Sequence, residues 1–124
     1  MNHRAYGRLT DVGPLVALTN AVTARWPQGR PLEFVHAPFA AADDPPPLTE
    51  SFYAPLAGLS LPAGTRFVAG FAHEDQPVDE QRQILTFIER YAGRPVDVAT
   101  SFGLGRRDED AARRALERVA ELSG

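Results

Sequence analysis

The fold is decided by residues 66–99, RFVAGFAHEDQPVDEQRQILTFIERYAGRPVDVA. Residues 66–72 are rich in strand formers, and residues 78–91 carry apolar side chains at helical spacing before Gly93, a residue typical of a helix end. Residues 95–99 predict a further strand. A strand, a helix and a strand in this order predict parallel strands joined by a right-handed crossover.

The same alternation extends in both directions from this stretch. The other predicted elements are a helix at 11–25, a strand at 32–37, a short helix at 51–59 and a final helix capped by Asp108, with residues 3–7 as the candidate for a fourth strand. Four strand and helix units are half of a (β/α)8 TIM-type barrel, whose usual size is roughly 250 residues. We therefore expect an α/β half-barrel of about four parallel strands with flanking helices, forming one domain over residues 1–124 with a proline-rich excursion at 39–65.

Composition removes several classes of function. The chain has 124 residues and a net charge of −3, and its 13 basic residues are all Arg, so no clustered basic face for nucleic acid is expected. It has no Cys, which excludes disulfides, thiolate metal sites and cysteine nucleophiles. No stretch approaches 18 consecutive apolar residues and the first residues lack a signal-peptide core, so we expect a cytoplasmic protein that makes no membrane contact.

A candidate catalytic group follows the strand at 66–72. His73, Glu74 and Asp75 place an imidazole beside two carboxylates at the carboxyl end of a parallel strand, where functional residues of such sheets gather. The alternative is a solvated loop, or the acidic first turn of the next helix.

The three histidines form a second candidate site. His3, His36 and His73 each fall at or just beyond the end of a predicted strand, so we expect them to face one rim of the sheet. A metal site containing His3 and His36 is one reading, with zinc as its metal, and imidazoles that bond loop backbone or water are the other. We expect no cofactor.

The turn before the last helix is a candidate anion site. Gly103 and Gly105 can present backbone N–H groups to a small anion, and Arg106 and Arg107 add positive charge. A glycine pair at a strand-to-helix turn also has a purely steric explanation. The excursion at 39–65 is either a lid or partner-binding segment or a linker.

Four segments carry a resemblance to a known family. They are residues 101–107 (SFGLGRR), residues 71–73 with Gln76 and Pro77, residues 3–7 (HRAYG) and residues 52–56 (FYAPL). With them the chain resembles the C-terminal half of the catalytic barrel of cobalamin-independent methionine synthase and its short relatives, which belong with the uroporphyrinogen decarboxylase-like barrels. The resemblance spans nearly all of the chain.

The resemblance implies a thiol methyltransferase with a degenerate zinc site. His3 matches the first zinc ligand of the family and His36 stands where its carboxylate or alternative histidine would be, but Ala5 and Phe102 occupy the two cysteine positions. The family's zinc site is therefore expected to be absent. His73 matches the histidine that the family uses as a proton donor.

Half a barrel leaves sheet edges and one sheet face uncovered, so the sequence predicts a partner. We expect either a homodimer that closes eight strands or a complex with a chain that supplies the complementary half. The first functional hypothesis is a methionine-synthase-like subunit of a larger methyltransferase-type assembly. The second is a non-catalytic assembly or regulatory protein, including a truncated remnant.

Overall fold

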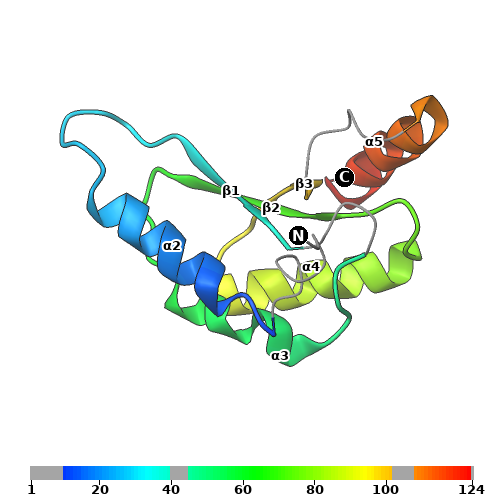
Figure 1. Ribbon diagram of the computed structural model, residues 1–124, viewed down its shortest axis with the longest axis horizontal. Helices are drawn as coiled ribbons and strands as arrows, with labels where there is room; N and C mark the ends of the chain where they lie inside the picture. Colours follow the sequence, from blue (N-terminus) through cyan, green and yellow to red (C-terminus); the bar gives the residue numbers. More distant parts are fainter. Residues whose placement is uncertain (1–9, 40–44, 102–107, 124) are drawn as a thin grey trace, which may run out of the picture.

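A computed structural model describes residues 10–39, 45–101 and 108–123 of the chain (Figure 1). Its elements are α2 (Gly13–Ala24), β1 (Phe34–Pro38), α3 (Glu50–Tyr53), the 3-10 helix η1 (Ala54–Gly58), β2 (Arg66–Ala72), α4 (Val78–Ala92), β3 (Asp97–Thr100) and α5 (Glu109–Ser123). The elements predicted between residues 11 and 122 are confirmed, with ends shifted by a few residues. The fourth strand predicted at residues 3–7 lies outside the described residues.

The three strands form one parallel sheet in the order β1-β2-β3. Phe34 pairs with Arg66 and Val68 pairs with Asp97, and a register irregularity lies between Gly70 and Ala72. Parallel neighbours need crossover connections, and α3 with η1 and then α4 provide them. The predicted α/β class with parallel strands is confirmed.

One face of this sheet carries the hydrophobic core. Alternate strand residues point to the same face, so Phe67, Ala69 and Phe71 of β2 lie side by side in the core. They join one buried cluster with side chains from η1, α4 and α5, including Leu56, Ile84, Phe87, Ile88 and Leu122. Side chains from several helices are therefore held to the same face of the sheet.

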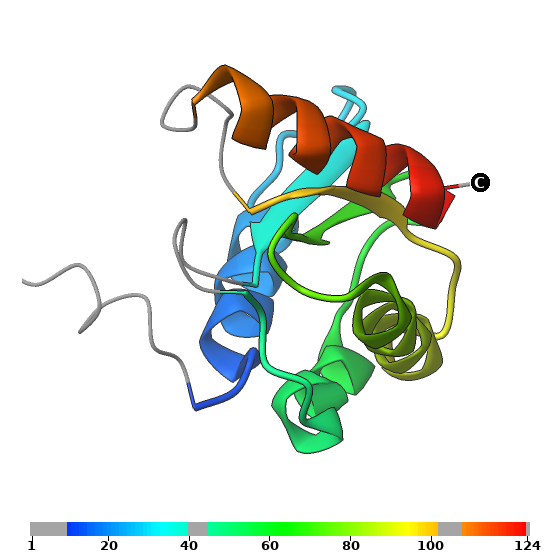
Figure 2. The same cartoon turned by 90° about the vertical axis from the view of Figure 1, so that its right-hand side faces the viewer.

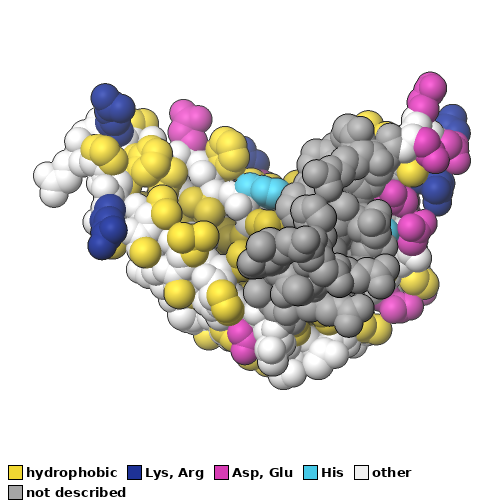
Figure 3. All heavy atoms as spheres, in the orientation of Figure 1, with side chains coloured by type: hydrophobic (Ala, Val, Ile, Leu, Met, Phe, Trp, Pro, Cys, Tyr) yellow, Lys and Arg dark blue, Asp and Glu magenta, His cyan; other side chains and the backbone are white. Residues whose placement is uncertain are grey.

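The opposite face of the sheet is open in the described part of the chain. Phe34, Arg66, Val68 and Asp97 alternate with the core residues, and Phe34 is 58% exposed. With neighbouring residues they line an open depression of about 440 Å³. Figure 3 shows a histidine side chain on the upper side of the molecule, beside the lobe that carries many hydrophobic side chains.

The two long helices end and pack as their sequences require. Gly93 ends α4 with a left-handed φ of 71°, and its N–H donates to the Glu89 carbonyl. Helix α5 lies over β3 and crosses α4, which Figure 2 shows almost along its axis. The helical spacing of apolar residues between 111 and 122 assigns Leu116 to the buried side of α5 with Ala115 and Leu122, but Leu116 is 57% exposed. That assignment is wrong because the described residues leave this flank of α5 uncovered.

None of the helices in the described residues combines the length and the apolar character that a membrane crossing needs.

Candidate functional site

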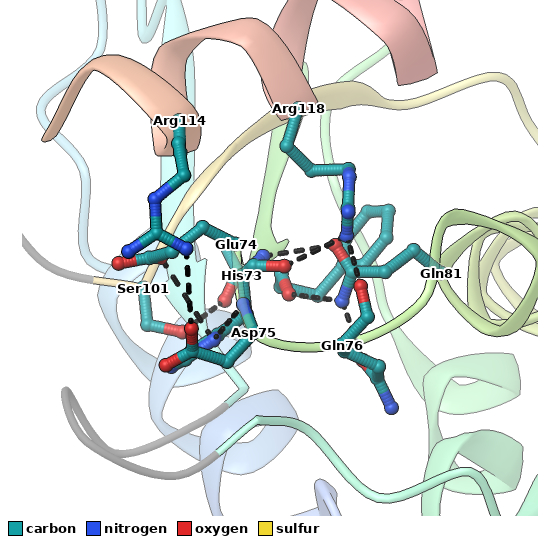
Figure 4. A network of polar contacts seen from close by, with 10 residues as sticks. His73, Glu74, Asp75, Gln76, Gln81, Ser101, Arg114 and Arg118 are labelled. Carbon is teal, nitrogen blue, oxygen red and sulfur yellow. Dashed lines mark hydrogen bonds and ion pairs between the residues drawn. The ribbon is translucent and has the colours of Figure 1, made fainter. Parts of the chain in front are cut away.

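The predicted catalytic residues lie in the turn that connects β2 to α4. His73 follows the last residue of β2, and the turn closes when Gln76 N–H approaches the His73 carbonyl at 3.5 Å. This is the carboxyl edge of a parallel sheet, where the sequence placed the site. His73, Glu74 and Asp75 are thus brought together at the expected edge (Figure 4).

A buried glutamine of α4 holds this turn from below. Gln81 is 0% exposed, and its Oε1 accepts the His73 N–H at 2.8 Å. Its Nε2 donates to the Phe71 carbonyl at 3.1 Å and to Oε1 of Gln76 at 2.5 Å. Gln76 in turn donates to the Pro46 carbonyl at 3.2 Å, which ties the proline-rich segment to the same network. A buried amide with every partner in place fixes its surroundings more rigidly than apolar packing alone.

The His73 ring is buried and the tautomer of its neutral form is set by the backbone. The N–H of Asp75 donates to Nδ1 of His73 at 3.1 Å. Because that backbone N–H can only donate, Nδ1 accepts, and the proton of the neutral ring sits on Nε2. His73 is therefore arranged as a donor through Nε2.

The two carboxylates of the turn have different surroundings. Most of the Glu74 side chain is buried, with Oε1 3.8 Å from Nδ1 of His73, which is an ion-pair distance only when the ring is protonated. Asp75 points outward and lies 3.6 Å from Arg114 of α5. The acidic pair is therefore only partly solvated, because Asp75 is exposed while most of the Glu74 side chain is buried.

Two arginines of α5 complete the site from the other side, as Figure 4 shows. Arg118 donates through one nitrogen to the His73 carbonyl, at 2.8 Å, and to the Gln76 carbonyl. Arg114 reaches Asp75 one helical turn earlier. Gln76 had entered only through the family resemblance, and no site role was predicted for Gln81, Arg114 or Arg118. The sequence did indicate that Gln81 is buried, because it stands three residues before Ile84 on the buried side of α4.

The other predicted residues are placed apart from this turn. His36 is exposed on the open face, and its Nε2 lies 3.0 Å from the Thr100 carbonyl at the end of β3. The ring passes directly over Gly70, where an added Cβ would come within 2.6 Å of Nε2. His3, Gly103, Gly105, Arg106 and Arg107 lie outside the described residues, so the anion site and half of the predicted metal pair stay predictions.

Two observations bear on a metal. In the described ranges, no three His, Cys, Asp or Glu side chains come together in a group that could hold an ion. The chain has no cysteine, and the soft thiolate ligands of the zinc site in the resembled family cannot be rebuilt from imidazoles alone. The residues of this chain therefore do not fit that zinc site.

The open face offers a charged pair beside apolar side chains. Arg66 and Asp97 meet through two contacts, of 2.7 and 2.9 Å, across β2 and β3. The hydrogen bond to Asp97, with its charge, raises the pKa of Arg66. Phe34 and Val68 lie in the same depression.

Comparison of the chain with protein-family models, curated proteins and solved structures found no match.

Proposed function

We propose that this chain is a methionine-synthase-like half-barrel and one subunit of a larger methyltransferase-type assembly. The observation that carries the proposal is a parallel sheet with helices packed on one face, an open second face, and a rigid histidine turn at its carboxyl edge. Parallel sheets are almost always covered on both faces, so the open face needs a partner. A partner with further strands would turn that face into the interior of a barrel.

Within such an assembly His73 is the proton donor. Its Nε2 carries the proton while Gln81 and Arg118 hold the backbone of the turn on either side. To protonate a leaving group, the ring must carry protons on both nitrogens, with Nδ1 then facing Oε1 of Glu74 at 3.8 Å. Release of the Nε2 proton returns the ring to its neutral form, a contribution of typically 10²–10⁴-fold to a rate. The resemblance adds the reaction, transfer of a methyl group to a thiol.

No step of this proposal runs through a metal held by this chain, because its residues do not fit the zinc site of the resembled family. Either the partner brings thiolate ligands of its own, or the assembly works without them. The proton donor and the walls of the pocket are what this chain supplies.

The test uses the assembly as it is isolated from the host, supplied with a methylfolate donor and homocysteine as the thiol. Mass spectrometry measures the methylated thiol. We expect His73→Ala to lower the rate at least 100-fold, because it removes the donor. Asp79→Asn, an exposed change in the first turn of α4, is the control and should stay within twofold of the natural chain. Equal rates for the two variants would contradict the role of His73.

A second candidate is a non-catalytic assembly protein, and one observation favours it. The N–H, the carbonyl and Nδ1 of His73 are all engaged within the fold, by Gln81, Arg118 and Asp75. A histidine that only stabilises a turn needs the same contacts. An assembly of intact composition that forms no methylated thiol would decide for this candidate.

A further inference from the structure

The exposed large apolar side chains of this molecule gather at the two ends of its row of helices, near α2 and near α5. Leu18 and Val22 on α2, with Trp26 just beyond it, are 63%, 47% and 41% exposed, and Leu116 on α5 is 57% exposed. Helix α4, which lies between them and contacts both η1 and α5, has none. Phe34 lies on β1, an edge strand of the sheet that the described residues form. Only Leu48, before α3, stands outside this pattern among the described residues.

The apolar side chains of α2 lie on one stripe of the helix. Leu18, Val22 and Trp26 are spaced by four residues, so they stack along one flank. The helix cannot rotate to bury them, because Asn20 donates to the Gly58 carbonyl at 2.9 Å and accepts the Ser60 N–H at 2.8 Å. Its buried side is already occupied by Val16.

Helix α2 also has no charged residue along its 12 positions, which is unusual for a helix with so much exposed surface. Figure 3 shows hydrophobic side chains gathered over the lobe where Figure 1 places α2. An uncharged stripe of this kind is best covered by another apolar surface.

We propose that a second copy of this chain covers these apolar ends. The two half-barrels then form one closed barrel and are related by a twofold axis that runs parallel to the strands. The inference rests on the half-barrel part of the proposed function. Rotation about such an axis keeps every strand parallel, so the edge on the β1 side of one copy's sheet meets the β3 edge of the other. The stripe on α2 then packs on the flank of α5 that carries Leu116.

The area of a stable dimer interface requires contacts at both apolar ends of each copy. The stripe spans eight residues, about 12 Å of helix, whereas a stable protein interface buries roughly 1,200–2,000 Å². One stripe is too small for this. A closed dimer has two identical interfaces, which we call seams. Each seam combines the contact between α2 and α5 with the pairing of two sheet edges.

The test is the mass of the full-length protein in solution, measured by light scattering and sedimentation. We expect a dimer that Leu18→Glu with Val22→Glu weakens at least tenfold, and that Leu116→Glu weakens equally. Ala17→Glu, which is also exposed but lies about 100° around α2 from Leu18, is the matched control and should leave the dimer unchanged. Circular dichroism checks that each variant is folded.

Mixing the two weakened variants gives the sharpest result. In a closed pair one seam would carry both changes and the other would be intact, so the mixture should form more dimer than either variant alone. A folded monomer at all concentrations overturns the proposal, and so does a dimer that Leu116→Glu leaves intact. These readouts do not depend on methyl transfer, so failure here is distinct from failure of the proposed reaction. A barrel closed by two copies of this chain contains no cysteine. If the dimer forms, assaying it for thiol methylation distinguishes between the two candidate functions.

Discussion

At the scale of single residues, a glutamine decides where the candidate site stands. Gln81 occupies a core position of α4, yet its amide joins the end of β2, the His73 turn and Gln76. Burying an amide is costly unless its hydrogen bonds are made, and here both ends of the amide are paired. The turn is therefore held by the interior of the molecule and not by its own loop sequence.

Replacing Gln81 by Leu should lower the free energy of unfolding by about 2–3 kcal/mol. Leu keeps the volume apolar but leaves the His73 N–H without its acceptor and the Phe71 carbonyl without this donor. Urea unfolding measures the change. Gln83→Leu, on the exposed side of the same helix, should stay within about 0.5 kcal/mol. Similar losses for both variants would mean that the amide network contributes little.

At the scale of elements, α5 both closes the core and supports the site. Leu122 and Val119 pack on the core cluster while Arg114 and Arg118 reach the turn after β2. The position of these arginines depends on where the helix begins. Asp108 sets that point, because its Oδ1 accepts the Ala111 N–H at 2.7 Å, as the sequence predicted.

Asp108→Ala should destabilise the protein by about 1 kcal/mol, because it removes the acceptor for a free N–H at the start of α5. Asp108→Asn keeps an acceptor at the same position and should be close to neutral. Thermal unfolding of the two variants beside the natural chain measures the difference. Loss of stability in the Asn variant equal to that in the Ala variant would assign the effect to charge and not to the cap.

At the scale of the whole molecule, one tyrosine connects the layers of the core. Tyr53 is fully buried, its ring packs on Phe39, Phe52 and Phe87, and its hydroxyl donates to the Pro47 carbonyl at 2.7 Å. Burial raises the pKa of Tyr53 far above its ordinary value. Any ionisation of this hydroxyl therefore requires the core to open.

This predicts a fall in stability at alkaline pH. The unfolded chain releases the tyrosine proton above about pH 10, while the folded chain, with its raised pKa, retains it. The folded state then binds more protons, so the free energy of unfolding falls as pH rises from 10 to 12, by up to about 1.4 kcal/mol per pH unit. Urea midpoints at pH 8–11 should decline more steeply for the natural chain than for Tyr53→Phe. Parallel declines would contradict this assignment.

The sequence by itself determined the kind of elements and their order. Apolar spacing, proline and glycine positions and the cap at Asp108 are local features, so residues 66–72 and the helix after them could be placed before any coordinates. Strands that alternate with helices also implied parallel pairing, and the sheet confirms it. The place of His73 at a carboxyl edge follows from the same order.

Only the tertiary structure decided which side chains meet at that edge. Arg118 reaches His73 across 45 residues, and His36 reaches Thr100 across 64. Such contacts depend on how helices and strands cross, which no local pattern records. The exposure of Leu18, Val22 and Leu116 could not be predicted from the sequence either. Helical spacing shows which apolar residues share one side of a helix, but not whether another element packs against that side.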